Sequence, residues 1–288
     1  MDKLDIKKFN HNNICIHPTI VILSKRGGGK STIIRSLLDS MRESSSFIIF
    51  SPSEKTDPFF SKFIPESYIY YEVTSRALQK IITRQSILKQ KLEKRHEEGK
   101  SEINIDLVVV FDDCLASAMK WKKDSNLREI MMNGRHFFIT FIIALQDPMG
   151  LPHDLRPNFD YVFLLKDRNL NNRPKYYKNY SSGFPDEKTF SRIYDKITSV
   201  KYNCMVMVNN DRDGIERDDN NFLEYVYHYK ADPIDIDILS CKQLIQFNKR
   251  NYNKNWNSMD TMRRFISDHI DKKIIDNFKV QLTNQNIP

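Results

Sequence analysis

Short apolar runs alternate with longer amphipathic stretches along the chain, a pattern typical of an α/β domain with a mainly parallel sheet. Residues 108–111 and 141–145 lack polar alternation, which indicates strands that are covered on both faces at the centre of the sheet. The predicted strands span residues 19–24, 47–51, 68–73, 105–111, 137–145, 161–165, 204–208 and 222–229. The apolar and polar residues of the last segment alternate, and this alternation predicts a strand at the sheet edge.

The amphipathic stretches predict helices over residues 30–41, 74–98 and 186–198. After Pro233 the chain becomes polar and rich in asparagine, and a further amphipathic helix is expected over about residues 258–280. That helix could dock on the core, or it could form an arm that contacts DNA or a neighbouring subunit. The sequence therefore predicts an α/β domain over residues 1–230 and a basic helical extension over residues 231–288.

The composition is that of a folded protein with an ordinary surface, since 40% of the 288 residues are hydrophobic and 28% are charged. The apolar runs are far shorter than the roughly 20 residues of a membrane-spanning helix, so we expect no membrane span. The first ten residues lack the apolar segment of a secretory signal, and a cytosol-like compartment is expected. No CxxC pair occurs, which predicts four free thiols: Cys15, Cys114, Cys204 and Cys241.

The charge is unevenly distributed along the chain. The formal net charge is +8, and residues 241–288 contain nine Lys and Arg against four Asp, a balance of +5. Such a balance favours a polyanionic partner such as nucleic acid, although it is also a common way to remain soluble.

Residues 24–31 read Ser-Lys-Arg-Gly-Gly-Gly-Lys-Ser and stand between a predicted strand and a predicted helix, the context that a Walker A motif requires. Consecutive glycines let backbone N–H groups converge on phosphate oxygens, and the helix N-terminus attracts the same anion. We expect Lys30 to reach the β and γ phosphates of ATP, Ser31 to ligate Mg²⁺ and Thr32 to lie near the α phosphate. The motif has Ser24 where Gly or Ala is usual. The expected nucleotide-binding residues are Ser24, Lys25, Arg26, Gly27, Gly28, Gly29, Lys30, Ser31 and Thr32.

Two adjacent acids, Asp112 and Asp113, close the apolar strand 108–111, where a Walker B element is expected. A carboxylate at the end of such a strand can hold Mg²⁺, and a second can orient or deprotonate the water that attacks the γ phosphate. We assign Asp112 to the metal and Asp113 to the water. The alternative is that the two acids simply begin a loop.

Gln146 follows the next buried strand, so in a parallel sheet its amide is expected level with the acidic pair, where it would sense the γ phosphate. The combination of SKRGGGKST, VVVFDD, the NGRH of residues 133–136 and a strand ending in glutamine resembles the genome-packaging ATPases of large nucleocytoplasmic DNA viruses. This family is a branch of the FtsK/HerA superfamily. The segment 151–165 is also similar, and the resemblance covers about residues 14–165.

The resemblance implies a P-loop NTPase core of the additional-strand, RecA/FtsK-like type, with a central, mostly parallel sheet flanked by helices. It also implies a homo-oligomeric ring that moves double-stranded DNA into a capsid without sequence preference. Capsid, portal or membrane proteins of the virion are further candidate partners, and the expected location is the viral factory in the host cytoplasm or the virion. An arginine finger from a neighbouring subunit belongs to this mechanism, and Arg135 within NGRH is our first candidate, with Arg156 and Arg168 as rivals.

These expectations combine into one hypothesis, a Mg²⁺-dependent ATPase that translocates viral DNA. Its catalytic residues would be Lys30, Asp113, Gln146 and Arg135, and its metal ligands Ser31 and Asp112. The alternative is a P-loop nucleoside or polynucleotide kinase, for which the basic segment 166–178 could serve as a lid. A third possibility is a DNA-binding scaffold in which ATP serves only to hold the shape.

Overall fold

The structure is a computed structural model that describes residues 5–44, 46–181, 183–218, 220–232 and 237–253. Its centre is an eight-stranded sheet with the order β3-β2-β4-β5-β1-β6-β7-β8. The strands are β1 (Thr19–Leu23), β2 (Ser46–Phe50), β3 (Ile69–Tyr70), β4 (Leu107–Phe111), β5 (Ile139–Leu145), β6 (Tyr161–Leu165), β7 (Cys204–Val208) and β8 (Val226–Tyr229). Neighbours from β3 to β6 pair parallel, whereas β7 pairs antiparallel with both β6 and β8. This arrangement confirms the predicted α/β class with a mostly parallel sheet.

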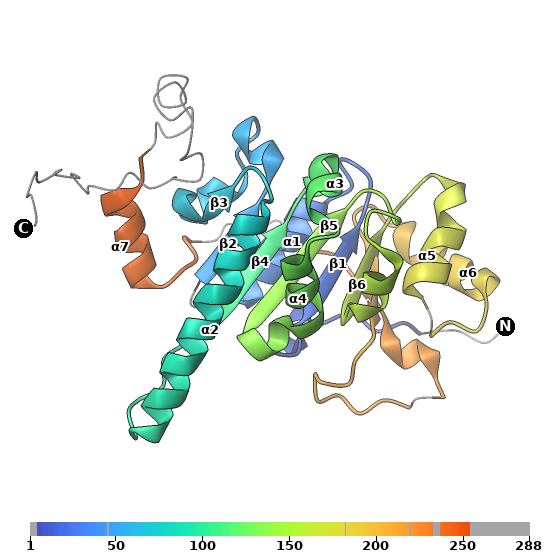
Figure 1. Ribbon diagram of the computed structural model, residues 1–288. Coiled ribbons are helices and arrows are strands. Elements are labelled where there is room, and N and C mark those ends of the chain that lie inside the picture. Colours follow the sequence, from blue (N-terminus) through green and yellow to red (C-terminus); the bar gives the residue numbers. More distant parts are fainter. Residues whose placement is uncertain (1–4, 45, 182, 219, 233–236, 254–288) are drawn as a thin grey trace, which may run out of the picture.

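Helices cover both faces of the sheet (Figure 1). They are α1 (Lys30–Ser40), α2 (Ser75–Glu97), α3 (Ala118–Trp121), α4 (Ser125–Asn133), α5 (Arg173–Tyr180), α6 (Glu187–Thr198) and α7 (Lys242–Asn251). Successive strand residues alternate between two apolar cores, as Val21 and Ile22 show. One core includes buried side chains of α2, α4, α5 and α6, and the other includes those of α1. Burial on both faces explains why the central strands are almost entirely apolar.

Some element boundaries differ from those that the sequence predicts. The strand expected over residues 68–73 contains only Ile69 and Tyr70, because the chain leaves the sheet before Thr74, whose side chain accepts a hydrogen bond from the Ala77 N–H (3.2 Å) to cap α2. The first half of the strand expected over 222–229 is a 3₁₀ turn, and β8 does lie at the sheet edge. The apolar pattern does not predict the short helices α3, α4, α5 and α7.

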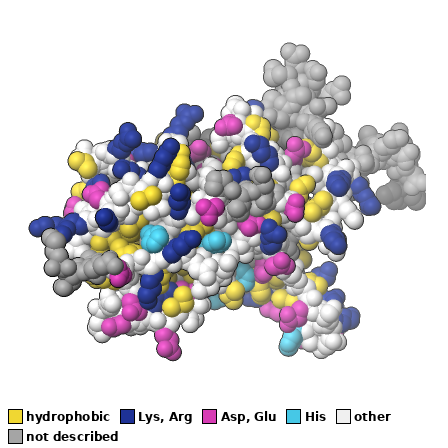
Figure 2. Space-filling model, turned by 180° about the vertical axis from the view of Figure 1, so that it is seen from behind, with side chains coloured by type: hydrophobic (Ala, Val, Ile, Leu, Met, Phe, Trp, Pro, Cys, Tyr) yellow, Lys and Arg dark blue, Asp and Glu magenta, His cyan; other side chains and the backbone are white. Residues whose placement is uncertain are grey.

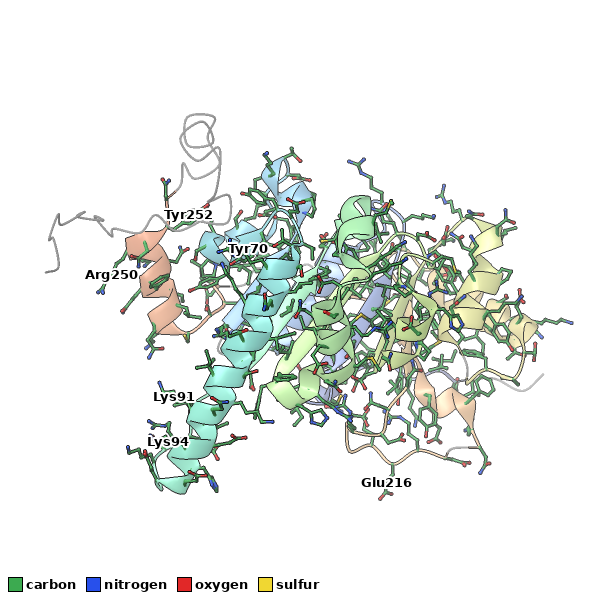
Figure 3. The ribbon with its side chains drawn as sticks, in the orientation of Figure 1. Tyr70, Lys91, Lys94, Glu216, Arg250 and Tyr252 are labelled. Carbon is green, nitrogen blue, oxygen red and sulfur yellow. The ribbon has the colours of Figure 1, made fainter. Side chains whose placement is uncertain are left out.

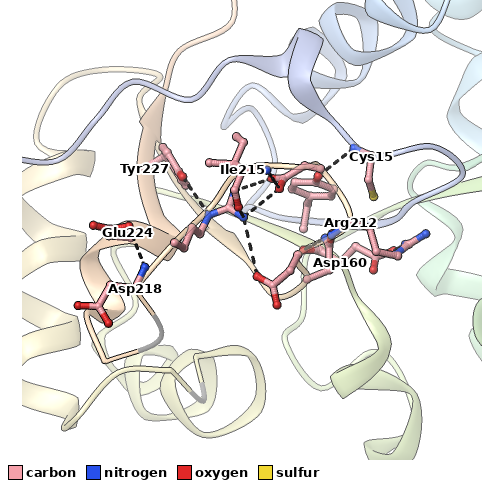
Figure 4. Close-up of polar contacts among 12 residues, drawn as sticks. Cys15, Asp160, Arg212, Ile215, Asp218, Glu224 and Tyr227 are labelled. Atoms are coloured by element: carbon pink, nitrogen blue, oxygen red, sulfur yellow. Dashed lines mark hydrogen bonds and ion pairs between the residues drawn. The ribbon is translucent and has the colours of Figure 1, made fainter.

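The connection from β7 to β8 lies at the edge of the sheet where the parallel strands begin, since Val208 pairs with Tyr161. The side chain of Arg217 is almost fully buried there and forms an ion pair with Asp213. Arg212 makes an ion pair with Asp160 (2.7 Å), a residue that also accepts a hydrogen bond from the Thr19 N–H (Figure 4). This network fixes the loop to the start of β1, away from the edge where the parallel strands end.

Part of the predicted C-terminal extension is described. Leu239 is buried in the core that also contains α1, and its N–H donates to the Phe63 carbonyl (2.8 Å). Helix α7 follows, and Asn248 of this helix accepts a hydrogen bond from the Ser67 N–H (3.0 Å). The amphipathic helix expected over residues 258–280 lies outside the described residues, and the division at residue 230 stays a prediction. None of the helices in the described part of the chain has the length and apolar character that a membrane span requires.

Candidate nucleotide-binding site

The glycine-rich loop between β1 and α1 has the backbone shape of a phosphate-binding loop. Gly27 and Gly29 adopt positive φ angles of 71° and 104°, which residues other than glycine rarely adopt. Gly28 is constrained by space instead, because a Cβ there would lie 2.0 Å from the Ser24 hydroxyl oxygen. Ser24 is 1% exposed and donates to the Lys25 carbonyl (3.1 Å). The serine in the first position of the motif therefore packs inside the loop, and Gly28 makes room for it.

Three predicted residues, one from the start of α1 and two from the ends of β4 and β5, meet beside this loop. The Lys30 ammonium lies 3.5 Å from Oδ1 of Asp113, and the Gln146 amide donates to the same oxygen at 2.6 Å. Parallel pairing of β4 with β5 and of β5 with β1 brings the three strand ends to one edge. Asp113 itself has a left-handed backbone (φ 53°), which turns the chain sharply after β4. The geometry thus joins the predicted Walker residues and the glutamine in one chain of contacts.

Asp112 lies deeper than its neighbour, at 4% exposure, and its Oδ1 has no hydrogen-bond partner. Burial, the negative charge of Asp113 and that of Glu54 raise its pKa to about 6, against the lowering effects of Lys30 and a hydrogen bond with Ser31. A buried carboxylate oxygen without a partner is costly, and a cation offsets that cost. Carboxylate and hydroxyl oxygens are ligands that suit Mg²⁺. Asp112 and Ser31 therefore fit the metal that a P-loop site uses.

These residues open into a cleft of about 880 Å³, which we call the catalytic cleft. Its acidic residues are Glu54, Asp57, Asp112, Asp113 and Asp232. Its basic residues are Arg26, Lys30, Lys62 and Lys230. Negative side chains thus outnumber positive ones by one in this cleft, and a bound metal cation would offset that excess.

Sequence reasoning missed several residues of the catalytic cleft. The buried Glu54 accepts hydrogen bonds from the N–H groups of Phe59, Phe60 and Ser61 at 2.8–2.9 Å, and so holds a turn that forms one wall. Tyr202, which precedes β7, lines the cleft near Gly29. Glu54 had a weak signal, an acid just after a predicted strand, whereas nothing in the sequence pairs Tyr202 with the loop.

The three candidate arginine fingers lie in different surroundings. Arg135 is exposed and precedes β5, so it lies at the edge of the sheet opposite the glycine-rich loop. Arg156 is 6% exposed and donates two hydrogen bonds to the Leu151 carbonyl and one to Asn179, which fixes its guanidinium inside the fold. Arg168 is exposed and lies beside Lys25 and Arg26 of its own chain. Of the three, Arg156 is the least free to reach another subunit.

Comparisons with known sequences relate this chain to viral proteins. Residues 6–182 match the family described as "Poxvirus A32 protein". "Uncharacterized protein L437" of Acanthamoeba polyphaga mimivirus is 36% identical over 208 residues, which cover 72% of each chain.

Two solved structures resemble the chain at low sequence identity. The conjugation coupling protein TcpA of pCW3, solved with ATPγS, has a TM-score of 0.52 at 15% identity, over 75% of this chain and 60% of that one. EssC (ATPases 2 and 3) from Geobacillus thermodenitrificans has a TM-score of 0.50 at 15% identity, over 81% of this chain and 43% of that one. These two likenesses show the P-loop NTPase fold.

Proposed function

This chain belongs to the poxvirus A32 protein family, and from that premise we propose that it is a Mg²⁺-dependent ATPase that moves double-stranded viral DNA into a capsid. The observation that carries the proposal is the catalytic cleft itself. In it a buried lysine, a buried carboxylate with an unpartnered oxygen, and a second carboxylate held by glutamine converge on a glycine-rich loop. This arrangement can bind a triphosphate, hold a metal and act on a water molecule.

Binding of ATP rests on the loop and on Lys30. The N–H groups of Gly27 and Gly29 and the N-terminus of α1 would face the phosphates, whereas the Gly28 N–H donates to the Lys25 carbonyl (3.1 Å). The Lys30 ammonium would replace its contact with Asp113 by contacts with the β and γ phosphates. Ser31 and Asp112 would hold Mg²⁺, which neutralises phosphate charge when bound. Lysine, loop and carboxylate together position the γ phosphate for attack.

Hydrolysis rests on Asp113 and Gln146. Asp113 accepts a proton from the attacking water, and the Gln146 amide, which donates to Asp113, fixes the direction of that carboxylate. Asp113 is partly exposed, with 31% of its side chain accessible, so water can reach it from the cleft. Because Gln146 follows β5, a change at Asp113 on loss of the γ phosphate would be transmitted to the end of that strand.

Assembly into a homo-oligomeric ring would complete the site, with Arg135 as the arginine finger from the next subunit. Its exposure supports this role, and its place opposite the loop means that only a neighbouring chain could bring it to a nucleotide. Mixing Arg135→Ala chains with Lys30→Ala chains tests it. Interfaces that join an intact Lys30 from one chain to an intact Arg135 from the next should regain ATPase activity. If rings form but the mixture stays inactive, the finger would be assigned to Arg168. We place the ring in the viral factory or the virion, where capsid or portal proteins would dock it.

The kinase alternative finds less support in the structure. The segment expected to serve as a lid is packed against the body, because the Asp167 N–H donates to the hydroxyl of the buried Tyr194 in α6 (2.7 Å) and Tyr176 is buried in the core. A segment held in this way is poorly suited to open and close over an acceptor.

The deciding experiment measures ATP hydrolysis with and without duplex DNA. We expect turnover to rise with duplexes of any sequence and the stimulation to weaken steeply with salt, because each neutralised phosphate releases counterions. The Lys30→Ala variant is the control for contaminating ATPases. Transfer of the γ phosphate to a nucleoside or polynucleotide, without stimulation by duplex DNA, would overturn the proposal in favour of a kinase.

A further inference from the structure

A second cleft lies on the other side of the glycine-rich loop and has a volume of about 720 Å³. We call it the cationic cleft. It is formed by the start of the loop, by the segment that follows β6 and by the turn that precedes β7. Its charged residues are Lys25, Arg26, Lys166, Arg168, Lys201 and Asp167. Five bases thus face one acid, whereas the catalytic cleft has four bases and five acids.

The single acid does not neutralise the five bases. Asp167 is 2% exposed and turned inward, where it accepts hydrogen bonds from the Asn169 N–H (2.9 Å) and from the side chains of Asn172 and Tyr176. Although burial opposes it, these bonds keep the pKa of Asp167 below its ordinary value. Because neighbouring residues of an extended segment point in opposite directions, the inward aspartate directs Lys166 and Arg168 outward, and both are exposed.

Within the described residues the five basic side chains lack a close carboxylate partner, although the charge of Lys25 helps to lower the pKa of Asp167 from a longer distance. None of them takes part in an ion pair there, and Lys201 instead places its ammonium 4.9 Å from the centre of the Tyr202 ring. By contrast, the charges over the face shown in Figure 2 are mixed, with Lys and Arg interspersed with Asp and Glu. A concave site with this uncompensated charge attracts a polyanion.

The cationic cleft shares a wall with the catalytic cleft. Arg26, Gly27 and Tyr202 line both, and a Cβ on Gly29 would lie 3.4 Å from the Tyr202 ring. The nucleotide phosphates already have Lys30, the loop and the metal ligands on the other side of this wall. Lys166, Arg168 and Lys201 line only the cationic cleft, and they are therefore available to a second phosphate-bearing ligand, one that would touch the loop holding the first.

We propose that the cationic cleft binds backbone phosphates of the DNA, so that the strand is held directly against the nucleotide-binding loop. This assignment rests on the proposed function. Phosphate contacts of this kind position a duplex without reading its sequence, as a packaging motor requires. The shared wall gives the bound strand a direct mechanical contact with the nucleotide site through Tyr202.

The test removes two cations that have no place in the catalytic cleft. The double variant Lys166→Ala/Lys201→Ala is compared with Lys91→Ala/Lys94→Ala, which removes the same charge from the exposed far half of α2, away from both clefts (Figure 3). Duplex binding is measured by fluorescence anisotropy over a series of salt concentrations. Because each phosphate contact contributes about 0.9 to the slope of log affinity against log salt, the cleft variant should lose about 2 from that slope and the control none.

The remaining outcomes separate this inference from the function on which it rests. If the wild-type protein neither binds duplexes nor hydrolyses ATP faster with them, the proposed function and this inference both fail. If the wild type does both but the two double variants have equal slopes, only the cleft assignment fails. Loss of affinity for a non-hydrolysable ATP analogue, with the DNA slope unchanged, would assign the cleft to the nucleotide. Loss of assembly with the DNA slope unchanged would assign it to an acidic surface of a neighbouring subunit.

Discussion

The catalytic cleft and the cationic cleft flank the same glycine-rich loop but are built differently. In the catalytic cleft the main charges are buried, with Lys30 at 6% and Asp112 at 4% exposure. Lys30 contacts Asp113, whereas one carboxylate oxygen of Asp112 has no hydrogen-bond partner. In the cationic cleft all five basic side chains are exposed to water, and their charges together produce the electrostatic attraction for an anion. Buried charges make strong, geometry-dependent contacts, whereas exposed charges act weakly and are screened by salt. A single substitution should therefore reduce ligand binding far more in the catalytic cleft than in the cationic cleft.

The largest effect is expected at Lys30, the buried cation of the catalytic cleft. Lys30→Ala should abolish both ATP binding and turnover, because no other buried cation lines the catalytic cleft among the residues that the structure describes. Binding of a fluorescent ATP analogue and steady-state hydrolysis measure the two effects. Lys62→Ala is the matched control, since Lys62 lines the same cleft but is exposed, and its loss should be far smaller. Equal losses in the two variants would contradict the contrast between buried and exposed charge.

Asp113 separates chemistry from binding within the catalytic cleft. Asp113→Asn should bind the ATP analogue but hydrolyse ATP on the order of 10² times more slowly, the usual scale for loss of a general base. Asp112→Asn should instead weaken the response to Mg²⁺, measured by titrating the metal in the hydrolysis assay. The reverse result, with Mg²⁺ response lost in Asp113→Asn alone, would exchange the two roles.

Asp112 should also lower the stability of the metal-free protein. Its pKa of about 6 lies above the ordinary value of 3.8, so the folded state binds the proton more tightly than the unfolded state does. The free energy of unfolding therefore falls as pH rises from about 4 to about 6, and the penalty is fully present above that range. We expect the stability of Asp112→Asn relative to wild type to grow by about 2 to 3 kcal/mol between pH 4 and pH 8.

Urea unfolding at several pH values, with a chelator present, measures this difference. Asp57→Asn is the control, because Asp57 lines the same cleft but is exposed. If the pH dependence of Asp112→Asn matched that of the wild type, the buried carboxylate would not be the source of the penalty.

The smallest effect concerns the packing inside the glycine-rich loop. Gly28→Ala places a methyl group against the Ser24 hydroxyl, and such overpacking should cost about 1 kcal/mol or more of stability. In a Ser24→Ala background the oxygen is gone and part of that cost should disappear, although the Lys25 carbonyl stays close. Thermal or urea unfolding of the two single variants and the double variant forms the cycle. An equal cost in both backgrounds would show that Ser24 does not shape the loop.

The sequence by itself determined the local parts of the catalytic cleft. The loop motif, the acidic pair and Gln146 each follow an apolar run, and in a parallel sheet the ends of such runs meet at one edge. The closeness of Gln146 to the acidic pair was predictable from this rule alone, whereas the contact of Lys30 with Asp113 was not predicted. The fold class followed for the same reason, because strands buried on both faces leave a continuous apolar signature.

Only the tertiary structure decided what stands on the other side of the loop. The pattern of residues 204–208 predicts a strand but carries no information about its direction. Since β7 runs antiparallel to β6, Cys204 pairs with Leu165, and the turn that contains Lys201 and Tyr202 reaches the edge where the glycine-rich loop lies. A parallel β7 would have placed that turn at the opposite edge. The direction of one strand, fixed by long-range pairing rather than by local sequence, therefore created the cationic cleft.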